Sequence, residues 1–347
     1  MEDLNKPFLI TRSLYPENQE TPIKLLPHHL IPTNYHFKRN HFNYPKILTQ
    51  NFLLPISGEV VRSVTFYFNQ IIHFPATTFT GLLECAGNNR SKFEPKTFGE
   101  QWEEGAISQG RWRGVSLSKL LSQTGLTTDA KEVLFEGYDF GKREDSDNYV
   151  PFSRSLPLEI ALHPDTIIAY EYNDKLLSIK HGFPLRLIVP GWYGMASVKW
   201  LKKITVINYL FTGPFQAIDY VYCPKDIEPF PVTTTNVNSI IQYPLNYSIL
   251  DTGTHTIEGI AWSGEGDITT VENSLDGHHW SNAVLLKNTT EPYAWTKWKY
   301  QWNALEGEYT IFCRATDSKG RRQPMNAFWN KKGYGYNATP KAHVKIT

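Results

Sequence analysis

The chain has 347 residues, and its 41% hydrophobic and 20% charged content is typical of a globular protein rather than a disordered one. The length exceeds what one ordinary hydrophobic core fills, which predicts two domains. The formal net charge is +1, from 35 Lys and Arg against 34 Asp and Glu, so no global charge attracts nucleic acid or an anionic membrane.

The N-terminal two-thirds of the chain mixes short strands with short helices. Residues 1–45 are proline-rich with interspersed aromatic side chains, which predicts an ordered, extended arm. Leu117, Leu120 and Leu121 share one face and predict a short helix over 116–122. The expected strands span 52–61, 78–83, 132–136, 166–172, 185–189 and 199–209. This mixture indicates an α+β domain, and neither a G-x-G-x-x-G turn nor a P-loop occurs.

The C-terminal third has a different, all-β pattern. Prolines cluster over 211–235, where we place the connection between a domain of residues 1–225 and one of residues 226–347. The expected strands are 256–261, 268–274, 295–302 and 308–315, with turn signals at 276–277 and 317–320. About 110 residues of this kind predict an immunoglobulin-like sandwich.

Cys85 carries the most chemical information. Residues 84–91 read ECAGNNRS and follow a predicted strand, so Cys85 stands in a Gly- and Asn-rich turn with Arg90 close behind. A thiolate beside a cation suits a metal ligand next to an anion pocket, although a lone cysteine is more often a small core residue. We assign no role to Cys223 or Cys313.

Other sequence features bear on location and cofactors. Three widely spaced cysteines argue against a disulfide framework and predict a reducing cytoplasm. No haem-attachment, zinc or iron–sulfur spacing is present. No apolar run reaches the length of a membrane span, and residues 1–7 lack the pattern of an export signal.

Several further motifs occur in a fixed order around residues 84–91. Residues 38–41 read KRNH, 105–108 GAIS, 112–115 WRGV, 135–137 FEG, 181–186 HGFPLR, 190–194 PGWYG and 198–201 VKWL. Farther on, residues 259–264 read GIAWSG and 314–317 RATD. Together they resemble the sulfite oxidase family of molybdopterin-dependent oxidoreductases, as a haem-free member of bacterial type.

The resemblance implies a molybdenum atom held by the dithiolene of a pterin cofactor and by one cysteine, which matches Cys85. A polarizable thiolate suits such a metal, and neighbouring cations favour its deprotonated form. The pterin contacts of the family map onto His41, Asp139, His181, Arg186 and Lys199. The family often has a basic residue where residues 195–197 read MAS, so one phosphate contact is missing or replaced here.

The resemblance also implies a substrate pocket over the metal. Its residues match Arg39, Arg90, Trp102 and Tyr220, and converging donors suit an oxyanion whose charge is spread over three oxygens. Sulfite-oxidising members often have an arginine where we align Lys332, which keeps the charge but loses the bidentate fork. The C-terminal domain resembles the family's dimerisation domain, which implies a homodimer.

Each of these residues has a structural alternative. A tryptophan group (Trp295, Trp298 and Trp302) suits either an apolar dimer patch or the sandwich core. His41 and His181 could be hydrogen-bonded residues of the scaffold, and Arg39 and Arg90 could form ion pairs at the surface. Trp102 and Tyr220 could pack in the core, and Asp139 could begin a turn.

The function that the resemblance implies is oxidation of sulfite by water to sulfate, with two electrons passed to a separate acceptor such as a cytochrome c. The alternative is reduction of nitrate or of an S- or N-oxide at the same metal. A non-catalytic scaffold that keeps the fold is a third hypothesis, against which Arg39, Cys85 and Arg90 count.

Overall fold

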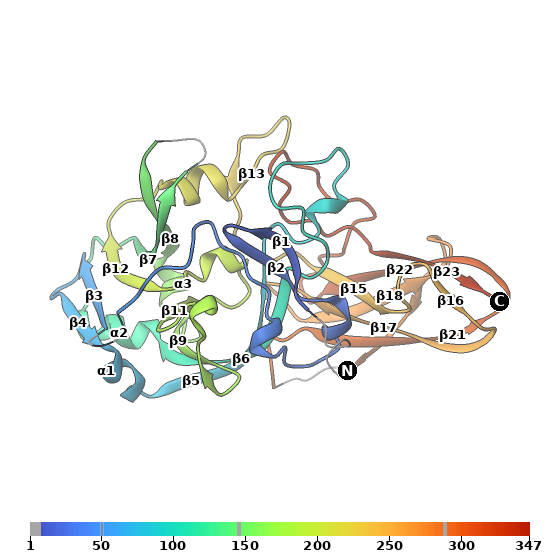
Figure 1. Cartoon of the computed structure of the whole chain (residues 1–347), viewed down its shortest axis with the longest axis horizontal. Coiled ribbons are helices and arrows are strands. Elements are labelled where there is room, and N and C mark those ends of the chain that lie inside the picture. The colour runs from blue at the N-terminus through green and yellow to red at the C-terminus, as the bar shows by residue number, and fades with distance from the viewer. Residues whose placement is uncertain (1–7, 49, 51, 144–146, 287–289) are drawn as a thin grey trace.

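The computed structural model describes residues 8–48, 50, 52–143, 147–286 and 290–347. Figure 1 shows two lobes: a lobe of mixed sheets with short helices, and an elongated lobe of strands that ends at the C-terminus. The predicted α+β domain followed by an all-β sandwich is confirmed. Among the described residues, no helix is both long and apolar enough to cross a membrane.

The N-terminal arm begins with a hairpin of β1 (Ile10–Leu14) and β2 (Glu17–Glu20). Short 3-10 turns at Ile23–Leu25 and Thr33–Tyr35 follow. The arm then returns to β2, because Gln19 and Lys38 exchange two backbone hydrogen bonds of 2.9 and 2.8 Å. This pairing fixes the position of the KRNH segment.

The first sheet of the mixed lobe carries the ECAGNNRS turn. Its order is β10 (Lys175–Leu176), β9 (Ile167–Tyr172), β6 (Ile107–Ser116) and β5 (Ala76–Glu84), with β11 (Arg186–Ile188) also paired to β9. Strand β5 ends at Glu84, so Cys85 is the first residue beyond the sheet, as the sequence predicts.

The second sheet of the mixed lobe has the order β4 (Val64–Tyr67), β3 (Leu53–Gly58), β12 (Leu201–Ile207), β7 (Glu132–Lys142) and β8 (Tyr149–Pro157). The β7–β8 register shifts between Glu136 and Phe140, and the ladder then resumes. Strand β7 therefore runs well past the predicted end at Glu136. Asp139 lies within this irregular stretch rather than starting a turn, so the turn alternative is wrong.

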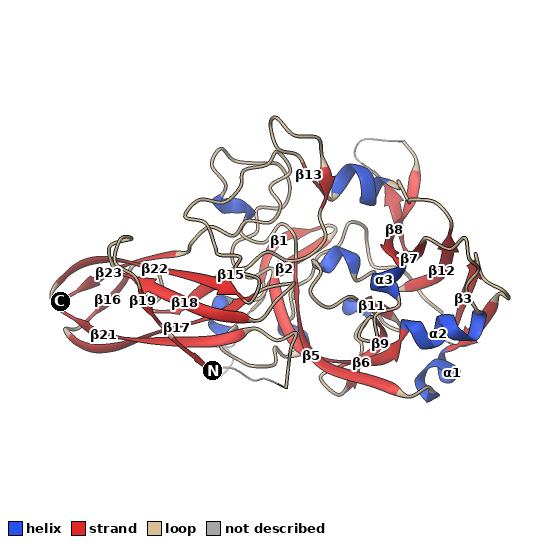
Figure 2. Ribbon diagram, turned by 180° about the vertical axis from the view of Figure 1, so that it is seen from behind, coloured by secondary structure: helices blue, strands red, loops and turns tan. Residues whose placement is uncertain are grey.

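Three short helices pack beside these sheets (Figure 2): α1 (Phe68–His73), α2 (Leu117–Thr124) and α3 (Leu158–Ala161). The predicted helix is α2, whose Leu117, Leu120 and Leu121 are buried in the main hydrophobic core of the lobe. A small hairpin of β13 (Val221–Tyr222) and β14 (Phe230–Pro231) then leads into the sandwich. The predicted domain boundary at 225–226 falls in the loop of this hairpin.

The sandwich consists of two sheets. One has the order β15 (Asn238–Tyr243), β17 (Gly253–Trp262), β21 (Thr296–Ala304) and β20 (Val284–Leu286). The other has the order β16 (Ser248–Leu250), β23 (Lys341–Ile346), β22 (Gly307–Asp317), β18 (Ile268–Ser274) and β19 (Ser281–Asn282). The proposed tryptophan patch is wrong: Trp298 and Trp302 are buried in the sandwich core, and Trp295 in a cluster beside it.

Hydrogen bonds tie the sandwich to the mixed lobe next to Cys85. The Nε1 atom of Trp262, at the end of β17, donates to Oε2 of Glu84 over 2.9 Å. The Nε atom of Arg90 donates to the carbonyl of Gly333 over 3.1 Å, and Gly333 belongs to the segment between β22 and β23. Both lobes therefore position the turn that follows β5.

Candidate active site

Two adjoining cavities meet at Cys85. The narrow cavity lies inside the mixed lobe and has a volume of about 690 Å³ together with its opening to solvent. The wide cavity has a volume of about 1400 Å³ together with its opening, and residues 331, 332 and 334 line one side. The four residues that line both cavities are Arg39, His41, Cys85 and Tyr220. A group bound to the Cys85 sulfur would therefore face both spaces.

The position of Cys85 follows from the end of β5. Its N–H donates to the carbonyl of Ala106 over 2.8 Å, which prolongs the pairing with β6, and its carbonyl accepts from the N–H of Asn88 over 2.9 Å. Burial raises the pKa of the Cys85 thiol, and the charges of Arg39 and Arg90 only partly oppose this effect. The neighbouring cations favour the thiolate, as expected, but burial outweighs them, so deprotonation would accompany metal binding.

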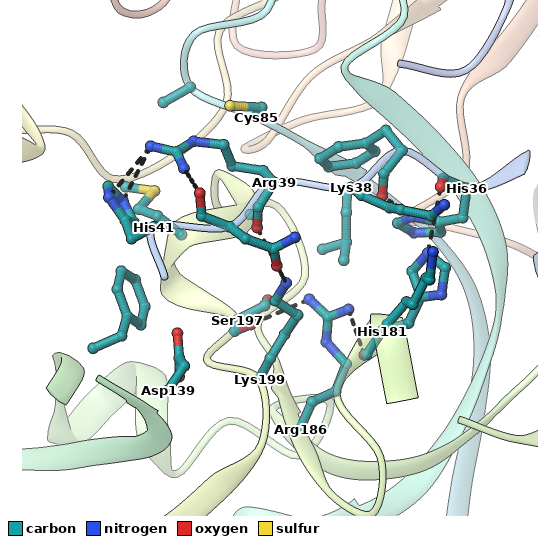
Figure 3. Close-up of a pocket in the computed structure, with 18 of the residues that line it drawn as sticks. His36, Lys38, Arg39, His41, Cys85, Asp139, His181, Arg186, Ser197 and Lys199 are labelled. Carbon is teal, nitrogen blue, oxygen red and sulfur yellow. Dashed lines mark hydrogen bonds between the residues drawn. The ribbon is translucent and has the colours of Figure 1, made fainter. Parts of the chain in front are cut away.

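All five residues predicted to bind the cofactor line the narrow cavity: His41, Asp139, His181, Arg186 and Lys199. Figure 3 shows His41 and Asp139 on one side of it and His181 on the other, with Arg186 and Lys199 between them. The structure thus gathers side chains that are up to 158 residues apart in the chain (from 41 to 199).

Arg186 starts β11 and is held on two sides. Its Nη1 donates to the carbonyl of His181 over 3.1 Å and its Nη2 to the carbonyl of Ser197 over 3.2 Å. Its Nε is buried without a hydrogen-bond partner among the described residues. Burial lowers the pKa of Arg186 to about 9, so the guanidinium is still charged at neutral pH.

Asp139 and Lys199 face the same cavity with unusual pKa values. Lys199 Nζ donates to the carbonyl of Arg39 over 3.1 Å and to Oδ1 of Asn40. Burial and the charge of Arg186 lower the pKa of Lys199 to about 7. Burial also raises the pKa of Asp139 to about 7, and its Oδ1 has no partner among the described residues. Lys199 therefore has two protein acceptors, whereas one oxygen of Asp139 has no partner among the described residues.

Asp139→Asn should stabilise the cofactor-free protein at alkaline pH. The pKa of Asp139 rises from 3.8 to about 7 on folding, so its ionisation increasingly destabilises the fold as pH rises through this window. Removing the charge should raise the Tm by about 2–4 °C at about pH 8 and leave it unchanged at about pH 4. Thermal melts of both proteins across this range test the prediction. An equal Tm shift at both pH values would contradict it.

The histidines of the narrow cavity are neutral. Burial lowers the pKa of His36 to about 3 and those of His41 and His181 well below the usual value. His36 Nδ1 lies 2.8 Å from the carbonyl of Phe37 and must donate to it, so its unpartnered Nε2 is an acceptor. His181 Nε2 likewise donates to the His36 carbonyl over 3.3 Å. His181 thus serves the scaffold and also lines the cavity.

The narrow cavity fits an anionic pterin. Its charged lining residues are Lys38, Arg39, Asp139, Lys180, Arg186 and Lys199, with five cations and one carboxyl. Cations suit a phosphate, and the unpartnered oxygen of Asp139 suits N–H groups of a pterin ring. A sulfur ligand at the opening suits a metal held by dithiolene sulfurs. Sequence reasoning assigned no role to His36, Lys38 or Lys180, although Lys38 belongs to the KRNH motif and Lys180 directly precedes the HGFPLR motif.

Arg90 lines the wide cavity, and its guanidinium fits closely against two glycines. It is 5% exposed, and its Nη1 donates to the Glu100 carbonyl over 3.0 Å. A Cβ atom at Gly87 or Gly99 would lie 2.7 or 2.8 Å from Arg90 Nη1, so a larger residue at either position would displace the guanidinium. The surface ion-pair alternative for Arg90 is therefore wrong.

Tyr220 is fixed by a stack of rings. Its hydroxyl lies 2.8 Å from His41 Nε2, and its ring stacks on Tyr334 at 5.3 Å. The guanidinium of Arg90 lies 4.8 Å from the Tyr334 ring centroid. Burial raises the pKa of Tyr220, so the phenol stays protonated. Sequence reasoning missed Tyr334, which lies in an irregular segment without periodicity.

The remaining predicted residues differ in their placement. Lys332 is half-buried and lines the wide cavity beside Lys331, with no ion pair among the described residues. Trp102 is fully buried in the hydrophobic cluster that contains Cys85, and it is not among the described residues that line either cavity. The structure therefore brings Lys332 to the pocket but leaves Trp102 behind it.

Comparison with known proteins identifies both lobes. A model of the oxidoreductase molybdopterin binding domain matches residues 41–215, and a model of the Mo-co oxidoreductase dimerisation domain matches residues 230–347. The sulfane dehydrogenase SoxCD from Paracoccus pantotrophus has a similar structure, with a TM-score of 0.83 and 28% identity over 99% of this chain and 87% of its own.

Curated relatives include enzymes of two kinds. Mitochondrial sulfite oxidase of Homo sapiens is 32% identical over 100% of this chain and 67% of its own length. NADH nitrate reductase 1 of Phaseolus vulgaris is 31% identical over 92% of this chain, which spans 40% of that protein. The molybdopterin binding domain includes most residues that line the narrow cavity, and its family binds a molybdenum–molybdopterin cofactor. The chain therefore belongs to the sulfite oxidase family of molybdopterin-binding oxidoreductases.

Proposed function

We propose that this oxidoreductase converts sulfite to sulfate. The observation that carries the proposal is the charge of the wide cavity next to Cys85. Arg39, Arg90 and Lys332 line it, while Asp219 is neutralised by Arg143 over 2.6 and 3.1 Å. An excess of cations around the wide cavity suits a small oxyanion whose charge is spread over several oxygens.

The side chains of the wide cavity have separate roles in this proposal. Arg90 is anchored through Nε and Nη1, which leaves Nη2 to donate to a substrate oxygen. Arg39 lies beside His41 and supplies a second guanidinium, while Lys332 adds a mobile point charge. Tyr220 keeps its proton and orients substrate or water from the shared wall of the cavities.

Cys85 would hold the metal, and His41, Asp139, His181, Arg186 and Lys199 would hold the pterin. The bound cofactor supplies two-electron oxygen-atom transfer, while the protein supplies position and charge. We further propose that the electrons leave to a separate acceptor such as a cytochrome c. The similarity to a sulfane dehydrogenase, which acts on another reduced form of sulfur, supports a sulfur substrate.

The alternative is reduction of nitrate or of an S- or N-oxide. The similarity to plant nitrate reductases favours it, as does a lysine in place of an arginine in the anion pocket. Steady-state assays separate the two directions: sulfite with an artificial electron acceptor, against nitrate or methionine sulfoxide with a reduced dye. Absence of sulfite turnover by fully metallated protein would refute the proposal.

Lys332→Ala should weaken substrate binding more than catalysis. A half-buried ammonium contributes about 1 kcal/mol to anion binding, so KM for sulfite should rise about three- to tenfold with little change in kcat. The effect should shrink as ionic strength rises. The exposed Lys299 in β21 offers a matched control, and Lys299→Ala should leave KM unchanged. An unchanged KM in Lys332→Ala would remove this residue from the substrate pocket.

The dimerisation domain supports a homodimer as the proposed assembly. Because the three tryptophans are buried, the interface must use other residues of the sandwich. One chain has a mass of 39.9 kDa, and sedimentation at micromolar protein should give twice this mass. A monomer under these conditions would refute the homodimer.

A further inference from the structure

One end of the narrow cavity contains a lysine pair that neither the pterin contacts nor the substrate pocket accounts for. Lys38 and Lys180 line the cavity and share a single carboxylate, Glu17 of β2. Glu17 lies 3.3 Å from Lys38 Nζ and 2.9 Å from Lys180 Nζ, and it also accepts from the hydroxyl of Tyr44 over 2.6 Å. Two ammonium groups thus face one carboxylate.

Lys38, Lys180 and Glu17 carry unbalanced charge in a partly buried position, where an uncompensated charge destabilises the protein. The Lys38 side chain is 8% exposed, and burial lowers its pKa despite the nearby carboxylate. Burial alone would raise the pKa of Glu17, but hydrogen bonds from Tyr44 and Lys180 lower it on balance, so the carboxylate is ionised. The three groups carry a net charge of +1, which an anion in the cavity would neutralise.

The lysine pair lines a cavity that lacks a cation at another expected position. Residues 195–197 lack the expected basic residue: Met195 and Ser197 line the cavity, and Ala196 is buried in the core. Figure 3 shows Lys38 on the same side of the cavity as His181, opposite Asp139. The side with Asp139 offers an acceptor for pterin N–H groups, whereas the side with the lysines offers donors.

We propose that Lys38 and Lys180 bind the phosphate group of the pterin cofactor, and that Glu17 of the N-terminal arm pairs with them when the cofactor is absent. The pair replaces the basic residue missing at 195–197, and Arg186, which lines the same cavity, adds a third cation. Lys180 is half exposed and can turn from Glu17 to the phosphate, while Lys38 stays anchored by Gln19 over 2.7 Å. The inference holds whichever substrate the enzyme uses.

A binding assay on the full-length, cofactor-free protein tests the proposal without turnover. The probes are the oxidised, fluorescent pterin released from the holoenzyme, with its phosphate and after enzymatic removal of it. Lys180→Ala should weaken binding of the phosphorylated probe about ten- to a hundredfold and leave the other unchanged. Lys202→Ala is the matched control, since Lys202 is 49% exposed and paired with Glu136, against 50% for Lys180. It should bind both probes normally.

Glu17→Gln separates a phosphate site from a structural anchor. If the lysines contact phosphate, releasing them from Glu17 should leave binding of the phosphorylated probe unchanged or make it tighter. If they only fasten the arm, Glu17→Gln and Lys180→Ala should weaken both probes equally, and the proposal would be overturned. The proposal would also be overturned if Lys180→Ala preferred the phosphorylated probe over the other probe as strongly as the wild type does. Pterin content of the purified holoenzyme gives a second readout and should fall in Lys180→Ala alone.

Discussion

Cys85→Ser should reduce sulfite turnover by more than about 100-fold while the protein stays folded. Even residues that merely support a metal ligand contribute about 10–100-fold, so the ligand itself should contribute more. Serine is close to cysteine in size and fits the same site after β5, where the backbone hydrogen bonds to Ala106 and Asn88 do not involve the side chain. The pterin should be largely retained, because its other contacts lie along the narrow cavity.

Three measurements check this expectation: kcat with sulfite, molybdenum content and pterin fluorescence after oxidation. Cys223→Ser is the matched control, because Cys223 is half-buried and is not among the described residues that line either cavity. The control should keep wild-type activity. Full activity in Cys85→Ser would show that another group binds the metal.

Arg90→Met should lower kcat/KM for sulfite by about 10²–10³-fold. Loss of one preorganised donor to a developing oxyanion has an effect of this size, and the buried guanidinium cannot be replaced by solvent in its slot. The substitution also leaves the carbonyls of Glu100 and Gly333 without their donor, which should lower stability by about 1–3 kcal/mol each. Activity must therefore be measured well below the Tm of the variant.

Two further variants serve as controls for Arg90→Met. Arg90→Lys keeps the charge but loses the fork, and should recover only part of the lost activity. Arg111→Met removes a half-exposed arginine of β6 that pairs with Asp174, and should leave kcat/KM unchanged. Equal activity of Arg90→Met and wild type would show that Arg90 does not contact substrate.

The sequence predicted most of the frame of the site, because that frame depends on local signals. The position of Cys85 after a strand, the helix α2 and strand β18 follow from apolar patterns that the structure reproduces. Strand β6 was not predicted, because its ten residues do not follow an alternation of apolar and polar side chains. Ser108 and Gln109 are fully buried there, where a hydrogen bond between the hydroxyls of Ser108 and Thr21 and one that Gln109 donates to the carbonyl of His29 satisfy them. These partners are distant in the chain.

The parts of the site that were missed depend on contacts between separate segments. Tyr334 acquires its place only by stacking on Tyr220 and under Arg90, and Lys38 and Lys180 become a pair only through Glu17. Trp102 shows the opposite error. The family resemblance predicted it in the pocket, but its side chain packs in the hydrophobic cluster that contains Cys85. Motifs name residues of one region without fixing the direction in which each side chain points.

The hydrogen bonds of Glu84 to Trp262 and of Arg90 to Gly333 have a consequence for protein engineering. The C-terminal third is not an interchangeable module, because it supplies one wall of the wide cavity and supports Glu84, the residue before Cys85. Exchanging this third with that of a relative should therefore alter substrate preference as well as assembly. Such a chimaera would have to carry the segment from β22 to β23 together with its partners on the ECAGNNRS turn.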